Sequence, residues 1–191
     1  LRKHLIANGV KVMFNTELVD FDNTSAKLLY NKEEKIEYFD YLVLAVGHSA
    51  TSIYELLKIK EVLLEPKNFA VGVRVEHLQN MINEVQYHGV YENLGAADYK
   101  LVAHVGNRSL YSFCMCPGGY VVNSSSEEKR LAINGMSNHA RDSKNANSAI
   151  LVTITPDDFG NNPLDGIAFQ RKLEELTYNL GNGNIPVQLF K

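Results

Sequence analysis

The chain has 191 residues, a length that fits one domain or one domain with part of a second. Apolar residues make up 45% of it and charged residues 21%, and the net charge is −3, so we expect a globular protein with no basic surface for nucleic acid. It has no apolar run of the roughly 18–20 residues that span a membrane, and two cysteines do not make the disulfide framework of a secreted protein. We therefore expect a cytoplasmic protein without a nucleic-acid or membrane partner.

The first predicted element is a helix that is already under way at residue 1. Residues 1–9, LRKHLIANG, have the pattern of its last turns, with Leu1, Leu5 and Ile6 on a buried face and Gly9 closing it. No capping residue begins this helix, and we interpret the chain as an internal fragment of a longer polypeptide. The apolar run at residues 10–14 then predicts a strand, which completes the second half of a β-α-β unit.

The next segment predicts a small hairpin and a buried strand. Residues 18–21 continue extended, and residues 27–30 and 35–38 can pair as a hairpin. Residues 42–46, LVLAV, are apolar without alternation, which indicates a strand covered on both faces, as in a parallel sheet. A helix is expected at residues 51–58.

After Pro66 the pattern changes to that of a β-rich domain. We expect a helix at residues 77–86 and a last helix that begins at Pro163, in which Phe169 and the leucines that follow it at helical spacing form one face. Strands are expected at residues 69–76, 110–116, 120–123, 131–134 and 148–155. The predicted fold class combines α+β and α/β: an α/β part at residues 1–65 and a β-rich α+β part with flanking helices at residues 66–191.

The two cysteines lie in the segment SFCMCPGGYVVNSSS, residues 112–126. On a regular strand, Cys114 and Cys116 point to the same face with Cα atoms roughly 6.6 Å apart, close to the upper limit of about 6.8 Å for a disulfide. Pro117 favours extended geometry at Cys116, which hinders a bridge. We favour two reduced, largely buried thiols and expect no metal site, because the histidines are scattered; a disulfide and a reactive thiol are the alternatives.

Residues 134–147, NGMSNHARDSKNAN, form the densest polar stretch of the chain. A long loop between strands is often functional. His139 can act as a general acid or base near neutral pH, and Arg141 can bind a carboxylate or phosphate through two hydrogen bonds. The alternative is a solvated loop whose polar side chains bond to their own backbone.

Two further pairs of polar residues are candidates. Tyr99 lies beside Lys100 and can polarise a carbonyl group, or both can simply lie on the surface. Arg74 and Glu76 share one face of a predicted strand, and for this spacing we favour an ion pair over a catalytic pair.

The segment DYLVLAVGHSA, residues 40–50, places a glycine directly after the predicted parallel strand, where the backbone can approach a nucleotide or make an ordinary turn. It is similar to the motif, often written Ala-Thr-Gly, that precedes the substrate domain of two-domain FAD-dependent oxidoreductases; Ala45-Val46-Gly47 occupies its place. Five other segments closely resemble a group of bacterial FAD-dependent dehydrogenases, often called NAD(FAD)-utilizing dehydrogenases: KNFAVGVRVEHLQ, AADYKL, SFCMCPGGYVVNSSSE, NGMSNHARDSKNANSA and GIAFQRKLEE. This resemblance extends over nearly the whole chain.

The resemblance implies that residues 1–65 are the remnant of an FAD-binding α/β domain and contribute a partial sheet edge. In the segment NTELVDF, the backbone of Leu18 would contact the adenine. The residues that would lie near the cofactor after the predicted strand are Ala45, Val46, Gly47 and His48.

Residues 66–191 would be the inserted substrate-binding domain of an FAD-dependent oxidoreductase, a flavoprotein dehydrogenase. His139 and Arg141 would orient or protonate a small-molecule substrate, and Cys114 or Cys116 would lie near the flavin ring. NADH or NADPH is the candidate electron donor.

The chain contains no Gly-x-Gly-x-x-Gly turn, the element that holds the pyrophosphate of a dinucleotide. We therefore expect FAD in the full-length protein but an inactive fragment that binds no FAD by itself, with the remainder of its own polypeptide as its partner. Two alternatives remain open. One is a non-catalytic or RNA-modification-type flavoprotein module in which FAD is structural, and the other is a stand-alone β-rich ligand-binding domain.

Overall fold

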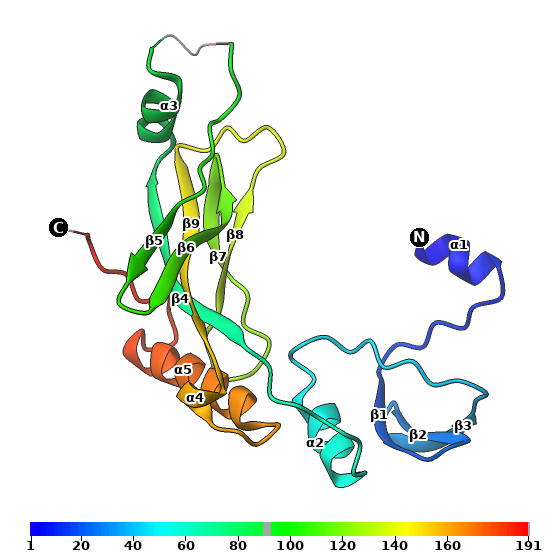
Figure 1. The fold of residues 1–191 in the computed structure, drawn as a ribbon. Coiled ribbons are helices and arrows are strands. Elements are labelled where there is room, and N and C mark those ends of the chain that lie inside the picture. Colours follow the sequence, from blue (N-terminus) through cyan, green and yellow to red (C-terminus); the bar gives the residue numbers. More distant parts are fainter. Residues whose placement is uncertain (90–92, 191) are drawn as a thin grey trace. The chain divides into compact units, whose positions relative to one another are not determined.

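The computed structural model describes residues 1–89 and 93–190, and the chain divides into two compact units, Leu1–Leu64 and Glu65–Lys191. Each unit has its own sheets and helices (Figure 1). No helix in the described part of the chain is both long and apolar enough to cross a membrane.

The first unit is built around a three-stranded antiparallel sheet in the order β1–β2–β3. Its elements are α1 (Arg2–Ala7), β1 (Thr16–Phe21), β2 (Ser25–Tyr30), β3 (Glu33–Tyr38) and α2 (Thr51–Ile59). Asn31 and Lys32 form the tight turn between β2 and β3, with φ of 48° and 70°. Positive φ at both turn positions matches the twist of the flanking strands, and the hairpin predicted from the sequence is confirmed.

Two strands predicted for this unit are wrong. Residues 10–14 and 42–46 form no strand, and neither run joins a sheet among the described residues. A strand leaves its backbone N–H and C=O groups unsatisfied unless a neighbouring strand pairs with them. The apolar side chains are correspondingly exposed: Val43 is 83% exposed, and Leu1, on the face of the first helix that was expected to be buried, is 97% exposed.

The second unit combines a four-stranded antiparallel sheet, in the order β4–β9–β6–β5, with the two-stranded ribbon β7–β8. Its helices are α3 (Gln79–Tyr87), α4 (Pro156–Phe159) and α5 (Asp165–Leu180). Its strands are β4 (Phe69–Leu78), β5 (Val102–Val105), β6 (Arg108–Cys116), β7 (Gly119–Asn123), β8 (Ile133–Ser137) and β9 (Asn145–Ile154). The α+β class is confirmed, and each strand and helix predicted here is present. The strand expected at residues 131–134 lies at Ile133–Ser137, however, and the last helix begins at Asp165, two residues after Pro163. The sequence pattern did not indicate β5 and α4.

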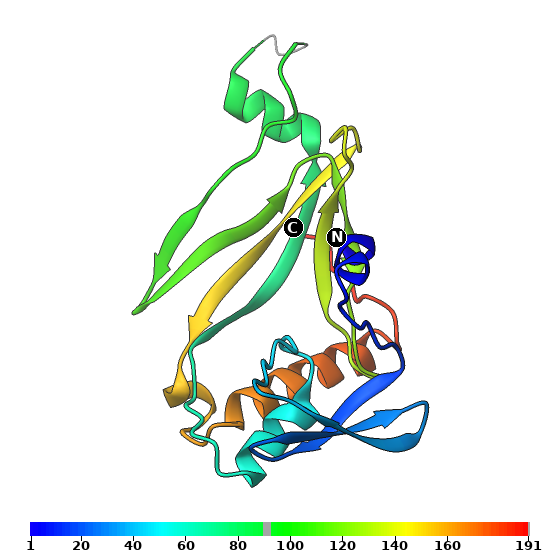
Figure 2. The ribbon, with the colours of Figure 1, turned by 90° about the vertical axis from the view of Figure 1, so that its right-hand side faces the viewer.

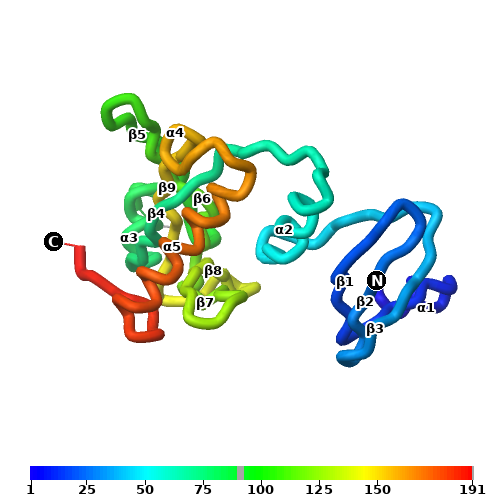
Figure 3. Tube along the Cα trace, turned by 90° about the horizontal axis from the view of Figure 1, so that it is seen from below, coloured from blue at the N-terminus to red at the C-terminus, as the bar shows by residue number. Residues whose placement is uncertain are grey.

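Helices lie at both ends of the four-stranded sheet. α3 continues from the end of β4, whereas α4 and α5 lie where β9 ends (Figures 1 and 3). Phe69 in β4 packs against Phe159 in α4 and Phe169 in α5, with ring centroids 5.1 Å and 6.2 Å apart. Of the apolar face predicted for α5, Phe169 is thus packed, while Leu180 is 78% exposed.

The ribbon β7–β8 runs next to β9 and also contacts β4 and β6 (Figure 2). A turn at Pro117 and Gly118 connects it to β6, and Gly118 has a φ of 51°. A Cβ atom on Gly118 would lie 1.9 Å from the carbonyl oxygen of Arg141, so the loop between β8 and β9 closes directly on this turn. The ribbon therefore holds polar residues of β8 against the sheet.

Candidate functional site

A cluster of polar groups lies where the ribbon meets the four-stranded sheet. Its members, the Arg74 cluster, come from four strands: Arg74 from β4, Cys114 and Cys116 from β6, Asn134 from β8 and Asn147 from β9. The strand register brings them together, because Cys116 pairs directly with Asn147. The two cysteines come from the segment 112–126 and the two asparagines are the ends of the polar stretch 134–147, but no pattern in the sequence joins these two segments to Arg74.

The guanidinium group of Arg74 is held entirely by neutral groups. Its Nη1 donates to the carbonyl oxygen of Cys114 at 3.3 Å and to Oδ1 of Asn147, and its Nη2 donates to Oδ1 of Asn134 at 3.4 Å. The sulfur of Cys116 lies 3.9 Å from Nη1. Among residues 1–89 and 93–190, Arg74 makes no ion pair, although it is half-buried.

The ion pair predicted between Arg74 and Glu76 is wrong. Oε1 of Glu76 instead accepts a hydrogen bond from Nδ2 of Asn145 at 2.6 Å. Two residues on the same face of one strand are close enough to pair, but each side chain here has a partner on β9 that is nearer. The charge of Arg74 is consequently left without a carboxylate.

Gly135 in β8 makes room for the guanidinium. A Cβ atom built on Gly135 would lie 2.1 Å from Nη1 of Arg74 and 2.2 Å from Oδ1 of Asn147. Both distances are far inside normal van der Waals separation, which is roughly 3.5–4.0 Å between carbon atoms. Glycine is therefore the residue that this arrangement of Arg74 and Asn147 requires.

Asn147 is fully buried, with an exposed fraction of 0%. Its Oδ1 accepts from Arg74, but its Nδ2 donates to no atom of the described residues. A buried donor without an acceptor costs about 1–3 kcal/mol, so such groups are rare outside sites with a particular role. The unused N–H groups of Asn147 lie on the same amide that contacts the guanidinium.

The two cysteines occupy different environments because β6 contains a bulge. The pairing of β6 with β9 is regular as far as Phe113 and shifts before Cys116. Cys114, inside the bulge, has a φ of 47°, a left-handed conformation that is uncommon for a residue with a side chain. Cys114 is exposed whereas Cys116 is 7% exposed, so the predictions that both are buried and share one face are wrong.

Both cysteines are free thiols, and no group of three His, Cys, Asp or Glu residues in the described ranges is arranged to hold a metal ion. The thiol of Cys116 donates to the carbonyl oxygen of Cys114 at 3.3 Å. Burial is the main cause that raises the pKa of Cys116, and the adjacent Cys114 adds to it. Cys116 is therefore a neutral thiol near pH 7 and does not offset the charge of Arg74.

Gln79 fixes the turn that follows Cys116. This side chain is 5% exposed; its Oε1 accepts from the backbone N–H of Gly118 at 2.8 Å, and its Nε2 donates to the carbonyl oxygen of Ala97 at 2.9 Å. Nε2 also donates to Oδ1 of Asn83 at 2.8 Å. A glutamine at the start of a helix carries no signal of such a role, which is why the sequence pattern did not single it out.

Tyr99 forms a pair with His77, not with the neighbouring Lys100. Its hydroxyl lies 2.8 Å from Nε2 of His77, and the two rings are 5.5 Å apart at their centroids. Burial raises the pKa of Tyr99, while a hydrogen bond with Ser148 opposes that rise. The phenol thus has a hydrogen-bonded partner that its sequence neighbours did not indicate.

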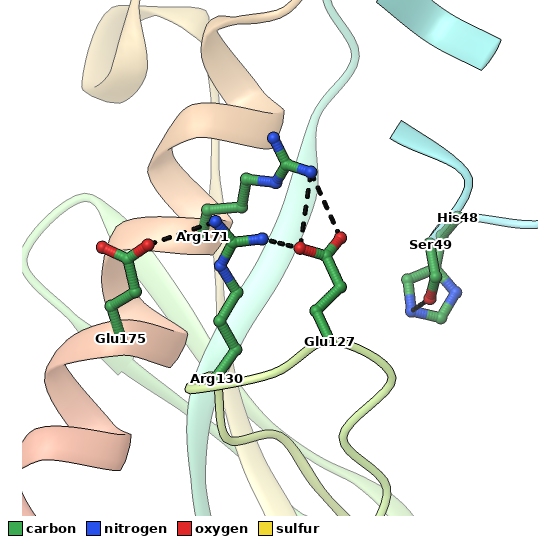
Figure 4. Close-up of polar contacts among 6 residues, drawn as sticks. All are labelled: His48, Ser49, Glu127, Arg130, Arg171 and Glu175. Atoms are coloured by element: carbon green, nitrogen blue, oxygen red, sulfur yellow. Dashed lines mark hydrogen bonds and ion pairs between the residues drawn. The ribbon is translucent and has the colours of Figure 1, made fainter. Parts of the chain in front are cut away.

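A charged network joins α5 to the loop that follows β7 (Figure 4). Arg130 pairs with Glu127 and, at 3.1 Å, with Glu175 in α5; Arg171 in α5 pairs with Glu127 at 3.2 Å. The side chains of Arg130 and Glu127 are only 19% and 28% exposed. Each arginine of this network has a carboxylate partner, which fits a role in holding the loop to the helix.

Residues 68–191 match the family described as FAD-dependent protein, C-terminal domain-like. The chain belongs to this family. A protein of Clostridium beijerinckii with the description "Uncharacterized protein" is 48% identical over 205 residues, an alignment that covers 99% of this chain and 37% of that protein. The chain thus spans little more than a third of the length of this curated relative. The FAD-dependent family expected from the sequence is confirmed.

Within the matched part of this FAD-dependent family member, His139 and Arg141 lie in the exposed loop between β8 and β9. The backbone N–H of Arg141 donates to the carbonyl oxygen of Asn138 at 3.0 Å, and Arg141 has a φ of 51°. No hydrogen bond or ion pair joins either side chain to the Arg74 cluster in the described structure. Their predicted contacts with substrate stay predictions.

The residues predicted to contact FAD lie in the first unit. Leu18 pairs with Leu28 in the sheet, whereas residues 45–48 lie in the connection to α2. There the hydroxyl of Tyr54 donates to the carbonyl oxygen of Gly47 at 2.9 Å, and Oγ of Ser49 lies 3.2 Å from Nε2 of His48 (Figure 4). Gly47 has a φ of 74°, which glycine adopts without strain. These cofactor contacts also stay predictions.

Proposed function

We propose that the chain supplies most of the substrate-binding domain of an FAD-dependent oxidoreductase of the dehydrogenase type. The remainder of the polypeptide to which the chain belongs would hold most of the cofactor. The substrate would be a small molecule of the cytoplasm. The family of residues 68–191 supports the flavoprotein class. The observation that carries the proposal of a reaction site is the half-buried Arg74, whose partners are all neutral.

The Arg74 cluster fits a group with electron-rich oxygens, such as a flavin or a substrate beside it. Gly135 leaves the space into which the guanidinium reaches, and Asn147 carries a buried donor with no acceptor among the described residues. When bound, FAD supplies the transfer of a hydride or of electrons, and nearby positive charge tunes its electronics. Arg74 and Asn147 would orient the oxygens.

The proposal also assigns roles to the other predicted residues. His139 and Arg141, in the loop that closes on the Gly118 turn, would orient or protonate the substrate. Cys114, the exposed thiol of the bulge, would be the cysteine that a dissolved substrate can reach. In the first unit, Leu18 and the residues from Ala45 to His48 would contact the cofactor.

The test uses the complete polypeptide that contains these residues. We expect it to purify with FAD and, without oxygen, to lose the visible absorbance of the oxidised flavin within seconds to minutes of mixing with NADH or NADPH. A protein that carries FAD but is reduced by neither nucleotide would favour the structural role of FAD. A protein that carries no flavin and cannot be reconstituted with FAD would overturn the proposal.

A further inference from the structure

We infer that the Arg74 cluster is a binding site for an oxyanion, a carboxylate or phosphate group that accepts hydrogen bonds from Arg74 and from the side-chain amide of Asn147. The identity of the molecule that carries the oxyanion rests on the proposed function, because a substrate carboxylate and the phosphates of FAD are its two sources. The existence of the site rests on the charges and donors of the second unit alone.

The first argument is charge. Arg108 pairs with Asp158 at 3.0 Å, and Arg130 and Arg171 each pair with Glu127 (Figure 4). Arg130 and Arg171 are half-buried like Arg74, whereas Arg108 is exposed. The described partners of Arg74, by contrast, are two side-chain amides, a peptide carbonyl and a neutral thiol. Burying a charge without a counter-ion is costly, and an oxyanion bound by arginine removes that cost through strong charge-assisted hydrogen bonds.

The second argument is the arrangement of donors. Nη1 of Arg74 donates to Oδ1 of Asn147. Nδ2, which has no acceptor among the described residues, belongs to the same side-chain amide and therefore lies close to the guanidinium. One oxyanion can accept from the guanidinium and from this amide together. It would satisfy a fully buried donor that has no acceptor among the described residues.

The third argument is access. Cys114 and Asn134, which accept from the two Nη atoms of Arg74, are both exposed, so these two partners of the guanidinium lie at the protein surface. The bulge at Cys114 turns a peptide carbonyl toward Arg74 and breaks the regular pairing of β6 with β9 at this point. The site therefore has a charged, partly open side and a buried side formed by Asn147.

The experiment is a calorimetric titration of the complete polypeptide, both with its FAD bound and after the FAD is removed, with sodium acetate and with sodium phosphate at constant ionic strength set with sodium chloride. We expect saturable binding of at least one of the two anions. Asn147→Asp keeps the shape of the side chain but places a carboxylate on Arg74, and we expect it to weaken binding at least about tenfold while the protein stays folded. Lys144→Gln, which removes an exposed positive charge from the neighbouring loop, should leave the affinity unchanged.

Flavin content then identifies the source of the oxyanion. If Asn147→Asp retains FAD but no longer binds acetate, the site takes a substrate carboxylate; if it purifies with much less FAD, the site takes a cofactor phosphate. Arg74→Gln should reproduce either result. The inference is overturned if the unchanged protein freed of FAD binds neither anion, or if Asn147→Asp in the same FAD-free form binds them as tightly as the unchanged protein. If the protein binds an anion but its flavin is not reduced by NADH or NADPH, the proposed dehydrogenase reaction is wrong and the oxyanion site stands.

Discussion

Gly135 and Arg74 lie so close together that the guanidinium occupies the space of a side chain at position 135. The Cβ atom of any other residue there would lie 2.1 Å from Nη1 of Arg74. The position of the Arg74 guanidinium therefore depends on the absence of a side chain at position 135, on another strand. A substitution at Gly135 moves the guanidinium of Arg74 but does not remove its positive charge. It therefore tests the position of the guanidinium separately from its charge.

Gly135→Ala should displace the guanidinium and weaken the cluster. We expect the free energy of unfolding to fall by about 1–3 kcal/mol, the usual cost of overpacking, and the affinity for the bound oxyanion to fall with it. Denaturant unfolding and calorimetric titration of the complete polypeptide measure the two effects. Gly95→Ala is the control, since no atom lies within 4 Å of a Cβ at Gly95. Equal stability and affinity in the two variants would contradict the packing described for Gly135.

Gln79→Ala removes three hydrogen bonds at once, to Gly118, Ala97 and Asn83. The N–H of Gly118 and the carbonyl oxygen of Ala97 are left in buried surroundings, and each such group costs about 1–3 kcal/mol. We expect a clear loss of stability in denaturant unfolding, together with faster hydrogen exchange at Gly118. Gln86→Ala, an exposed change on the same helix, should have little effect. If both glutamine variants unfold at the same denaturant concentration, Gln79 does not fix this turn.

The sequence pattern predicts the elements of the second unit because their signals are local. Alternation along β4 and helical spacing from Phe169 are set by residues that are neighbours in the chain. The run at residues 42–46 shows the limit of such signals. Its apolar side chains indicate a strand, but a strand needs a partner, and no described segment pairs with it.

The Arg74 cluster was out of reach of pattern reasoning for a different reason. Arg74 and Glu76 are two residues apart, which favours an ion pair, yet their nearest partners come from β9. The register between β4 and β9 decides which residues become the partners of Arg74 and Glu76. That register depends on the pairing of the whole sheet. The bulge at Cys114 has no sequence signal either, and it reverses the expectation that Cys114 and Cys116 share one face.

Asp22 makes the first unit sensitive to acid. Its carboxylate accepts hydrogen bonds from the backbone N–H groups of Thr24 and Ser25 and from the Ser25 hydroxyl, which lower its pKa from 3.8 to about 2. A lowered pKa stabilises the folded state above pH 3.8, and this contribution is lost as the pH falls through about 2.

Asp22→Ala should therefore reduce stability at neutral pH and flatten the dependence of stability on pH in this acidic range. Unfolding followed at a series of pH values measures the slope, and NMR titration of the Asp22 carboxyl group checks the pKa directly. Asp40→Ala, at an exposed position in the same unit, is the control. A carboxyl group of Asp22 that titrates at an ordinary pKa would rule out this explanation.

Cys114 and Cys116 should differ strongly in reactivity with iodoacetamide. Cys114 is exposed, whereas Cys116 is 7% exposed and burial raises its pKa, so at pH 7–8 Cys116 presents little thiolate to the reagent. We expect the Cys114→Ser variant to be alkylated at least about tenfold more slowly than the Cys116→Ser variant, and to catch up when the protein is unfolded in denaturant. Mass spectrometry of timed samples gives both rates in the complete polypeptide. Raising the pH should speed the slow reaction at Cys116, because its thiolate appears only above the ordinary pKa of a cysteine. Equal rates for the two thiols in the folded protein would mean that the bulge in β6 does not separate their environments.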